Sequence, residues 1–217
     1  LGVLENQGFK CVYSTNLKES SIDYDFFILS SSIVACETEV AAVSFLKKFK
    51  KPILIIGPFA QTCPEKYIKA GANVLMTESD TTLSTDKNFL KTLSLVGKKV
   101  YPSNTLAPIT DLPNPGWETI FKHKKSIMGF LGKGPSLAIY SSRGCPYSCF
   151  NYCTYPLQQG RKLRYESVLR IVDQIENYIK KLKVKSFLFR DPVFTINRNH
   201  VVELCNEIIN RKIKIVW

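Results

Sequence analysis

The stretch SLAIYSSRGCPYSCFNYCTYP, residues 136–156, runs from a strand-like pattern directly into a loop that contains three cysteines. Cys145, Cys149 and Cys153 lie close together, whereas the other four cysteines of the chain are isolated. Gly144 allows a sharp backbone turn before the first of them, and Pro146 stiffens the following step. Three thiols at this density, at the end of a strand, indicate a chemical role for the loop.

The residues after this loop alternate helix and strand patterns. Residues 165–182, YESVLRIVDQIENYIKKL, predict a helix whose apolar residues form one stripe. That stripe consists of Val168, Ile171, Val172, Ile175, Tyr178, Ile179 and Leu182. A strand is predicted in VKSFLFRDPVF, residues 184–194, and Asp191 with Pro192 ends it. We expect catalytic groups at the carboxyl ends of such strands.

The last predicted helix is NRNHVVELCNEIINRK, residues 197–212, with Val201, Cys205 and Ile208 facing inward. The residues IKIVW, 213–217, then begin a third strand. Strand, loop, helix, strand, helix and strand in this order predict the start of a parallel (β/α) barrel or half-barrel.

Residues 22–76 also alternate strand and helix patterns, which is typical of an α/β domain with a parallel sheet. Strands are predicted in DYDFFILSSS (23–32), in PILIIGPFA (52–60) and after Gly71. ETEVAAVSFLKKFKK (37–51) predicts the first helix, and a short second helix starts at Pro64 and stops at Gly71. The expected fold is a partial flavodoxin-like, or Rossmann-like, parallel-sheet domain.

Open parallel sheets bind ligands beyond the carboxyl ends of their strands, where the winding of the sheet reverses. This rule singles out Ser30, Ser31 and Ser32 after one predicted strand, and Gly57 and Pro58 after the next. Ordinary turn chemistry also explains these residues and is the favoured explanation when the sequence is taken alone.

The segment YPSNTLAPITDLPNPGWETI, residues 101–120, carries four prolines and no clear periodicity. Such segments are typical of linkers. We therefore expect an α/β domain over residues 1–95, a linker over 96–135 and the barrel domain over 136–217. The pattern at both ends of the chain indicates a fragment that is incomplete on each side.

Composition limits the classes of function. The 217 residues are 45% hydrophobic and 22% charged, as in ordinary globular proteins. The longest apolar run is far too short to cross a membrane, so we expect no membrane partner. The net charge of +12 comes from short groups of Lys and Arg scattered along the chain. A solvated surface explains them better than nucleic-acid binding, and we do not expect a nucleic-acid partner.

The odd number of cysteines argues against a disulfide framework and is consistent with a cytoplasmic protein. We expect Cys11, Cys36, Cys63 and Cys205 to be small buried apolar residues. A structural zinc site is one explanation for the cysteine loop, but it needs a fourth ligand, and His123 and His200 are distant in sequence. An iron-sulfur cluster with one open iron explains three thiols without a fourth.

These segments resemble the radical SAM enzymes with an amino-terminal cobalamin-binding domain. GPFAQTCPEKYIKAGANVLMTES (57–79) is similar to the later part of the cobalamin-binding domain, and DLPNPGW (111–117) to the connection. SSRGCPYSCFNYCTYPLQQGRKLRYES (141–167) is similar to the cluster loop and the start of the first barrel helix. The family's common motif is CxxxCxxC, whereas here three residues separate Cys149 from Cys153.

The resemblance implies that Cys145, Cys149 and Cys153 hold a 4Fe-4S cluster and that S-adenosyl-L-methionine (SAM) chelates its fourth iron. It implies cleavage of SAM to a 5′-deoxyadenosyl radical, which takes a hydrogen atom from a substrate. Tyr152 would lie against the adenine of SAM, and Asp191 would accept a hydrogen bond from its amino group. A cobalamin would lie near the residues singled out at the sheet edge, namely Ser30, Ser31, Gly57 and Pro58.

The partners implied are a small-molecule substrate and a one-electron donor such as flavodoxin or ferredoxin. Methyl transfer and rearrangement of a ring or carbon skeleton are both open as reaction types. Two alternatives remain: a radical SAM enzyme that modifies tRNA, and a non-catalytic module whose cysteines bind zinc.

Overall fold

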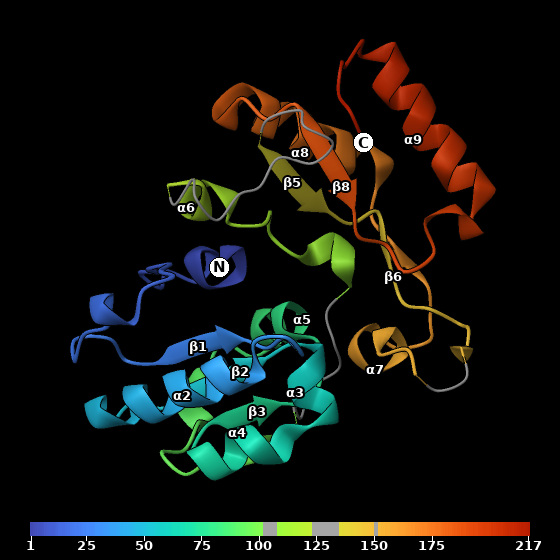
Figure 1. The fold of residues 1–217 in the computed structure, drawn as a ribbon. Coiled ribbons are helices and arrows are strands. Elements are labelled where there is room, and N and C mark those ends of the chain that lie inside the picture. Colours follow the sequence, from blue (N-terminus) through green and yellow to red (C-terminus); the bar gives the residue numbers. More distant parts are fainter. Residues whose placement is uncertain (102–107, 123–134, 150–151) are drawn as a thin grey trace. The chain divides into compact units, whose positions relative to one another are not determined.

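The structure is a computed structural model, and it describes residues 1–101, 108–122, 135–149 and 152–217 (Figure 1). Its contacts divide the chain into two compact units. The unit that we call the barrel-like unit comprises Leu1–Tyr13, Pro108–Pro146 and Arg161–Trp217, and the sheet unit comprises Ser14–Ala107 and Tyr147–Gly160. The amino-terminal helix, α1 (Gly2–Asn6), is thus grouped with the barrel-like unit.

Four parallel strands form the core of the sheet unit; the sequence predicts the first three, whereas the fourth lies in the predicted linker 96–135. The four strands are β1 (Phe27–Ser30), β2 (Ile53–Ile56), β3 (Asn73–Leu75) and β4 (Lys99–Val100). The strands lie in the order β1-β2-β3-β4, with Phe27 opposite Ile53 and Val74 opposite Lys99. This order follows the sequence, so the winding does not reverse between the described strands.

The described helices of the sheet unit are α2 (Cys36–Leu46), α3 (Pro58–Thr62), α4 (Pro64–Ala70), α5 (Ser79–Thr85) and α7 (Tyr155–Gln159). The sequence predicts two of these five helices, α2 and α4, whereas α3, α5 and α7 were not predicted. Short 3-10 turns complete the unit: η1 (Leu17–Glu19), η2 (Lys47–Phe49) and η3 (Phe89–Thr92). Gly71 ends α4 with a φ of 106°, a left-handed conformation that favours glycine.

The core of the sheet unit lies between the sheet and helices α2 and α4. Val43 and Leu46 from α2 and Tyr67 from α4 pack in one cluster with Ile53 and Ile55 of β2. Leu54, which points to the opposite face of the strand, is also fully buried. Strand β2 is therefore covered on both faces, which explains its continuous apolar sequence. In Figure 1, α2 and α4 lie alongside the arrows of this sheet.

A buried polar pair fixes α2 against α4. The Tyr67 hydroxyl donates a hydrogen bond to Glu39 Oε2 over 2.5 Å, and the Ser32 amide donates to Glu39 Oε1 over 2.8 Å. Glu39 is only 9% exposed and Tyr67 is fully buried. Burial, together with the hydrogen bond to Glu39, raises the pKa of Tyr67 above its ordinary value.

We expect Tyr67→Phe to lower the free energy of unfolding by about 1–3 kcal/mol, because Glu39 loses a donor inside the protein. Above about pH 10 an unfolded tyrosine releases its proton, whereas folded Tyr67 retains it, so the native protein should lose stability as pH rises. The variant should lose part of this alkaline dependence. Urea unfolding at pH 8 and pH 10.5 tests both effects, with Tyr24→Phe, at a partly buried tyrosine, as control. Equal alkaline slopes for variant and native protein would contradict this account.

The barrel-like unit contains a parallel strand pair with a helix between its strands in sequence, which is the predicted beginning of a barrel. Strand β5 (Ser136–Ile139) pairs with β8 (Ser186–Phe189), and helix α8 (Val168–Leu182) joins them. The predicted stripe of α8 is confirmed: Val168, Ile171, Val172, Ile175 and Tyr178 are buried. Val216 adds a parallel bridge to Ser186, where the sequence predicts a third strand.

The remaining elements of this unit are smaller, apart from the last helix. They are η4 (Ile109–Asp111), α6 (Trp117–Phe121), β6 (Ser142–Arg143), β7 (Arg164–Tyr165), η7 (Phe194–Ile196) and α9 (Arg198–Asn210). The predicted inward face of α9 is partly wrong. His200, Leu204 and Ile208 are buried, whereas Val201 and Cys205 are only partly buried. The apolar residues on several sides of this helix made the sequence pattern ambiguous.

The described part of the proline-rich connection is bound to α8. Arg170 donates hydrogen bonds to the carbonyl oxygens of Thr110 and Leu112, and the Tyr178 hydroxyl donates to that of Pro115 over 2.9 Å. Gln174 lies between them on the same face of α8 and bonds Asn114. Residues 102–107 and 123–134 of the predicted linker lie outside the described residues. Within the described residues, no helix is long and apolar enough to span a bilayer.

Candidate functional site

The cysteine loop leaves the carboxyl end of β5, where the sequence predicts it. Strands β5 and β8 end in register, with Ile139 opposite Phe189, and the Arg190 amide donates to the Ile139 carbonyl one step further. Asp191 follows directly, at the same edge of the strand pair. This edge is the position at which parallel barrels carry their functional residues.

The Asp191 carboxylate binds the first residues of the loop. Its Oδ1 accepts hydrogen bonds from Ser141 Oγ over 2.7 Å and from Ser142 Oγ over 2.6 Å. The Ser141 amide also donates to both carboxylate oxygens, each over 3.1 Å. Both serines are almost completely buried. The predicted contact of Asp191 with SAM stays a prediction, and the residue has a second set of partners that the sequence did not reveal.

A small antiparallel pair of strands, which the sequence pattern did not reveal, lies at the two ends of the cysteine loop. Ser142 of β6 lies opposite Tyr165 of β7, and Arg143 lies opposite Arg164. Gly144 follows with a φ of 93°, and a Cβ built on it would lie 2.1 Å from the Lys162 carbonyl oxygen. Only glycine fits here, because both the backbone angle and the space exclude a side chain.

The three cysteines of the loop lie in different surroundings. Cys145 is 4% exposed and belongs to the barrel-like unit, whereas Cys149 and Cys153 belong to the segment grouped with the sheet unit. Cys149 is exposed and Cys153 is partly buried. Cys149 also has a positive φ of 38°, which is uncommon for a residue with a side chain and often occurs at functional sites.

The donor chemistry of the loop fits an iron-sulfur cluster, since all three cysteines are free thiols and thiolates are the usual cluster ligands. Among residues 1–101, 108–122, 135–149 and 152–217, no three Cys, His, Asp or Glu side chains are close enough together to hold a metal ion. The ligand roles of Cys145, Cys149 and Cys153 therefore stay predictions.

The aromatic residue before the third cysteine is accessible. Tyr152 is 77% exposed, and its amide donates a hydrogen bond to the Cys149 carbonyl over 3.3 Å. An exposed ring in this position is available to stack on a flat ligand such as adenine. Its contact with SAM is a prediction that no contact in the structure tests.

The residues singled out in the sheet unit gather at the carboxyl ends of β1 and β2. Ser31 is buried, and its Oγ accepts a hydrogen bond from the Ala60 amide over 3.0 Å. Gly57 has a φ of 105°, with Ser31 Oγ only 3.1 Å from the place where a Cβ would lie. Pro58 is the first residue of α3, and Ser30 is exposed. The turn chemistry favoured from the sequence thus accounts for Ser31 and Gly57.

Two further contacts at this edge were missed by the sequence analysis. Gln61 of α3 donates to the Thr77 carbonyl over 2.9 Å, so the helix holds the turn after β3. Helix α7, which follows the third cysteine, packs against α3 within the same unit. Neither contact has a local sequence signal, because the partners are far apart along the chain.

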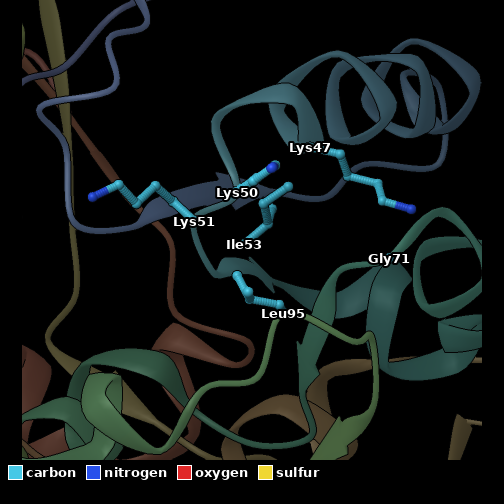
Figure 2. A pocket seen from close by; sticks show the side chains of 6 residues that line it. All are labelled: Lys47, Lys50, Lys51, Ile53, Gly71 and Leu95. Atoms are coloured by element: carbon cyan, nitrogen blue, oxygen red, sulfur yellow. The ribbon is translucent and has the colours of Figure 1, made fainter.

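A hollow of about 190 Å³ lies elsewhere in the sheet unit. It is lined by Lys47, Lys50, Lys51, Ile53, Gly71 and Leu95. Figure 2 shows that the ammonium groups of Lys47 and Lys51 point away from one another. Ile53 begins β2 and Gly71 precedes β3, so the hollow lies at the amino ends of these strands. It is therefore distinct from the edge at which ligands of parallel sheets bind.

The structure also tests the predictions for the four isolated cysteines and for the basic residues of the surface. Cys36 is buried as predicted, whereas Cys11 and Cys205 are only partly buried. The prediction is wrong for Cys63, which is exposed. Several basic residues form exposed ion pairs, for example Lys66 with Glu37 and Lys181 with Glu118. These pairs support the interpretation of the basic groups as surface charge.

No protein-family model matches the chain. Curated relatives do match. An uncharacterized methyltransferase of Pyrococcus horikoshii is 25% identical over 116 residues, which are 54% of this chain and 24% of that protein. The anaerobic magnesium-protoporphyrin IX monomethyl ester cyclase of Rubrivivax gelatinosus is 31% identical over 121 residues, 55% of this chain and 21% of the cyclase.

An uncharacterized methyltransferase of Synechocystis is 25% identical over 196 residues, which are 89% of this chain and 34% of that protein. The chain thus spans between a fifth and about a third of the length of these relatives. The last match covers most of the residues of both units. The chain is therefore a relative of these methyltransferases and cyclases, and its resemblance to the radical SAM enzymes with an amino-terminal cobalamin-binding domain is confirmed.

Proposed function

We propose that this chain provides the SAM-cleaving part of a radical SAM enzyme that transfers a methyl group or closes a ring on a small-molecule substrate. The observation that carries the proposal is the three-cysteine loop at the carboxyl end of β5, followed by α8 and β8. The loop lies where parallel barrels carry their chemistry. Relatives named as methyltransferases and as a cyclase support the reaction types.

In this proposal Cys145, Cys149 and Cys153 would hold a four-iron four-sulfur cluster. When bound, such a cluster supplies the electron that cleaves SAM to methionine and a 5′-deoxyadenosyl radical, which takes a hydrogen atom from the substrate. The chain's own residues position the reactants: Tyr152 stacks on the adenine, and Asp191 accepts a hydrogen bond from the SAM amino group. A one-electron donor such as flavodoxin or ferredoxin is the expected protein partner.

The sheet unit would bind cobalamin beyond the carboxyl ends of its strands. Ser30 is the exposed residue of the four proposed there, and Ser31 and Gly57 shape the turn beside it. A corrin bound at this edge would lack a histidine ligand from Ser30–Ser32 or Gly57–Phe59, because neither segment contains one.

Anaerobic reconstitution of the full-length protein with iron and sulfide tests the function. We expect a brown protein with a full four-iron cluster, which forms 5′-deoxyadenosine when it is reduced in the presence of SAM. A colourless protein that takes up zinc and no iron would contradict the proposal and favour the zinc-binding module. Omission of cobalamin from the same assay shows whether methyl transfer, as distinct from SAM cleavage, depends on the corrin.

A further inference from the structure

Asp191 bonds a segment that is fifty positions earlier in the sequence. An aspartate that merely forms a turn with the proline after it bonds backbone groups within a few residues of itself. Here the carboxylate instead accepts hydrogen bonds from two hydroxyl groups and one amide of Ser141 and Ser142, which follow the neighbouring strand β5. Because Ser141 and Ser142 are 0% and 1% exposed, water cannot readily replace these bonds.

The contact continues the strand pairing where the backbone ladder stops. The last ladder hydrogen bond runs from the Arg190 amide to the Ile139 carbonyl, and the side chain of the next residue, Asp191, takes over as acceptor. Ser142 then begins β6, which pairs with β7, and Gly144 packs against the Lys162 carbonyl. Only two residues, both held in this way, separate Ser142 from Cys145.

We propose that Asp191 is a positioning residue that sets the place of Cys145 through Ser141 and Ser142. The expectation that Asp191 influences an iron-sulfur cluster rests on the proposed function. The expectation that it holds Cys145 in place does not. Oδ1 accepts three of the hydrogen bonds, while Oδ2 shares only the one from the Ser141 amide. Oδ2 therefore retains capacity for one more donor, so the predicted contact with SAM is compatible with this role.

The direct test measures how fast Cys145 is alkylated by iodoacetamide in the reduced, metal-free full-length protein, with mass spectrometry of the peptides. Cys145 is buried in the native loop, so its reaction requires local opening. We expect Asp191→Ala to accelerate this reaction about ten- to a hundredfold, because a buried charge-assisted network is lost. The partly buried Cys205, in the same unit, should react at its native rate.

Asp173→Ala is the matched control, because Asp173 lies in the same unit and bonds Arg211 at an exposed position. Ser142→Ala should give a smaller acceleration, and combining it with Asp191→Ala should add less than the two single effects, since the two residues share one bond. Asp191→Asn, which keeps an acceptor oxygen, should restore part of the protection. A Cys145 rate within about twofold of native for both Asp191 variants would overturn the proposal.

A second measurement separates this proposal from the proposed function. After reconstitution with iron and sulfide, we expect Asp191→Asn to bind iron but to give an altered electron paramagnetic resonance spectrum of the reduced cluster. If native protein binds no iron, the proposed function fails, while the alkylation result still decides the role of Asp191. If Asp191→Ala does not fold, the Asn and Ser142 variants provide the same comparison.

Discussion

Replacing Cys153 with alanine should abolish cluster assembly and lower the rate of 5′-deoxyadenosine formation by more than about 100-fold. Loss of groups that only support metal ligands already costs about 10- to 100-fold, and loss of a ligand itself costs more. Cys153 is decisive because it lies one residue later than the third cysteine of the common family motif. Tyr152, at the usual position, carries a phenol and not the thiolate that is the usual ligand of iron-sulfur clusters.

Cys63→Ala is the matched control, since Cys63 is also a free thiol of the sheet unit but lies in no motif. Tyr152→Phe should retain the cluster, because the ring remains and only the hydroxyl is removed. Iron and sulfide content, the visible absorption spectrum and SAM cleavage are measured for all three variants. Normal iron content in Cys153→Ala would remove this residue from the ligand set and leave the motif without a third thiolate.

Gly144→Ala should lower the free energy of unfolding by about 3 kcal/mol or more and weaken cluster assembly with it. Two effects add at this position. The φ of 93° is unfavourable for a residue with a side chain, and the new Cβ would lie 2.1 Å from the oxygen and 2.8 Å from the carbon of the Lys162 carbonyl. Backbone on both sides must move, which displaces Cys145 directly after the glycine.

Gly8→Ala separates the two effects. Gly8 has a φ of 88°, and nothing lies within 4 Å of the place where its Cβ would be. This control should cost about 1 kcal/mol, from the backbone conformation alone. Urea unfolding of both variants, followed by iron analysis after reconstitution, gives the comparison. Equal losses of stability in the two variants would show that the close approach of Lys162 is unimportant.

Hydrophobic periodicity predicted the long elements well. The stripe on α8 has enough apolar residues on one face to identify both the helix and its buried side. Strands β1 and β2 are short apolar runs that end in small or turn-forming residues, and they lie where the sequence places them. Helix α9 has apolar residues around much of its circumference, so its buried face could not be chosen correctly from the pattern.

Contacts between residues that are distant in the sequence could not be predicted from local sequence patterns. Asp191 looked like a turn residue, because the motif Asp-Pro describes only its neighbours along the chain. Its bonds to Ser141 and Ser142 exist because β5 and β8 are adjacent, parallel and in register. The pairing of β6 with β7 and the contact of Gly144 with Lys162 were missed for the same reason, because they too join residues far apart in the sequence.

By itself, the sequence determined the two α/β patterns, the parallel strands and the cysteine loop between β5 and α8. These features follow from local spacing of apolar residues, glycines and thiols, which the chain carries wherever it folds. Tertiary structure alone decided which oxygen holds Ser141 and Ser142, why residue 144 has no side chain, and which side of α9 is buried. Those outcomes depend on strand pairing and packing between residues far apart in sequence, where no local pattern records the partner.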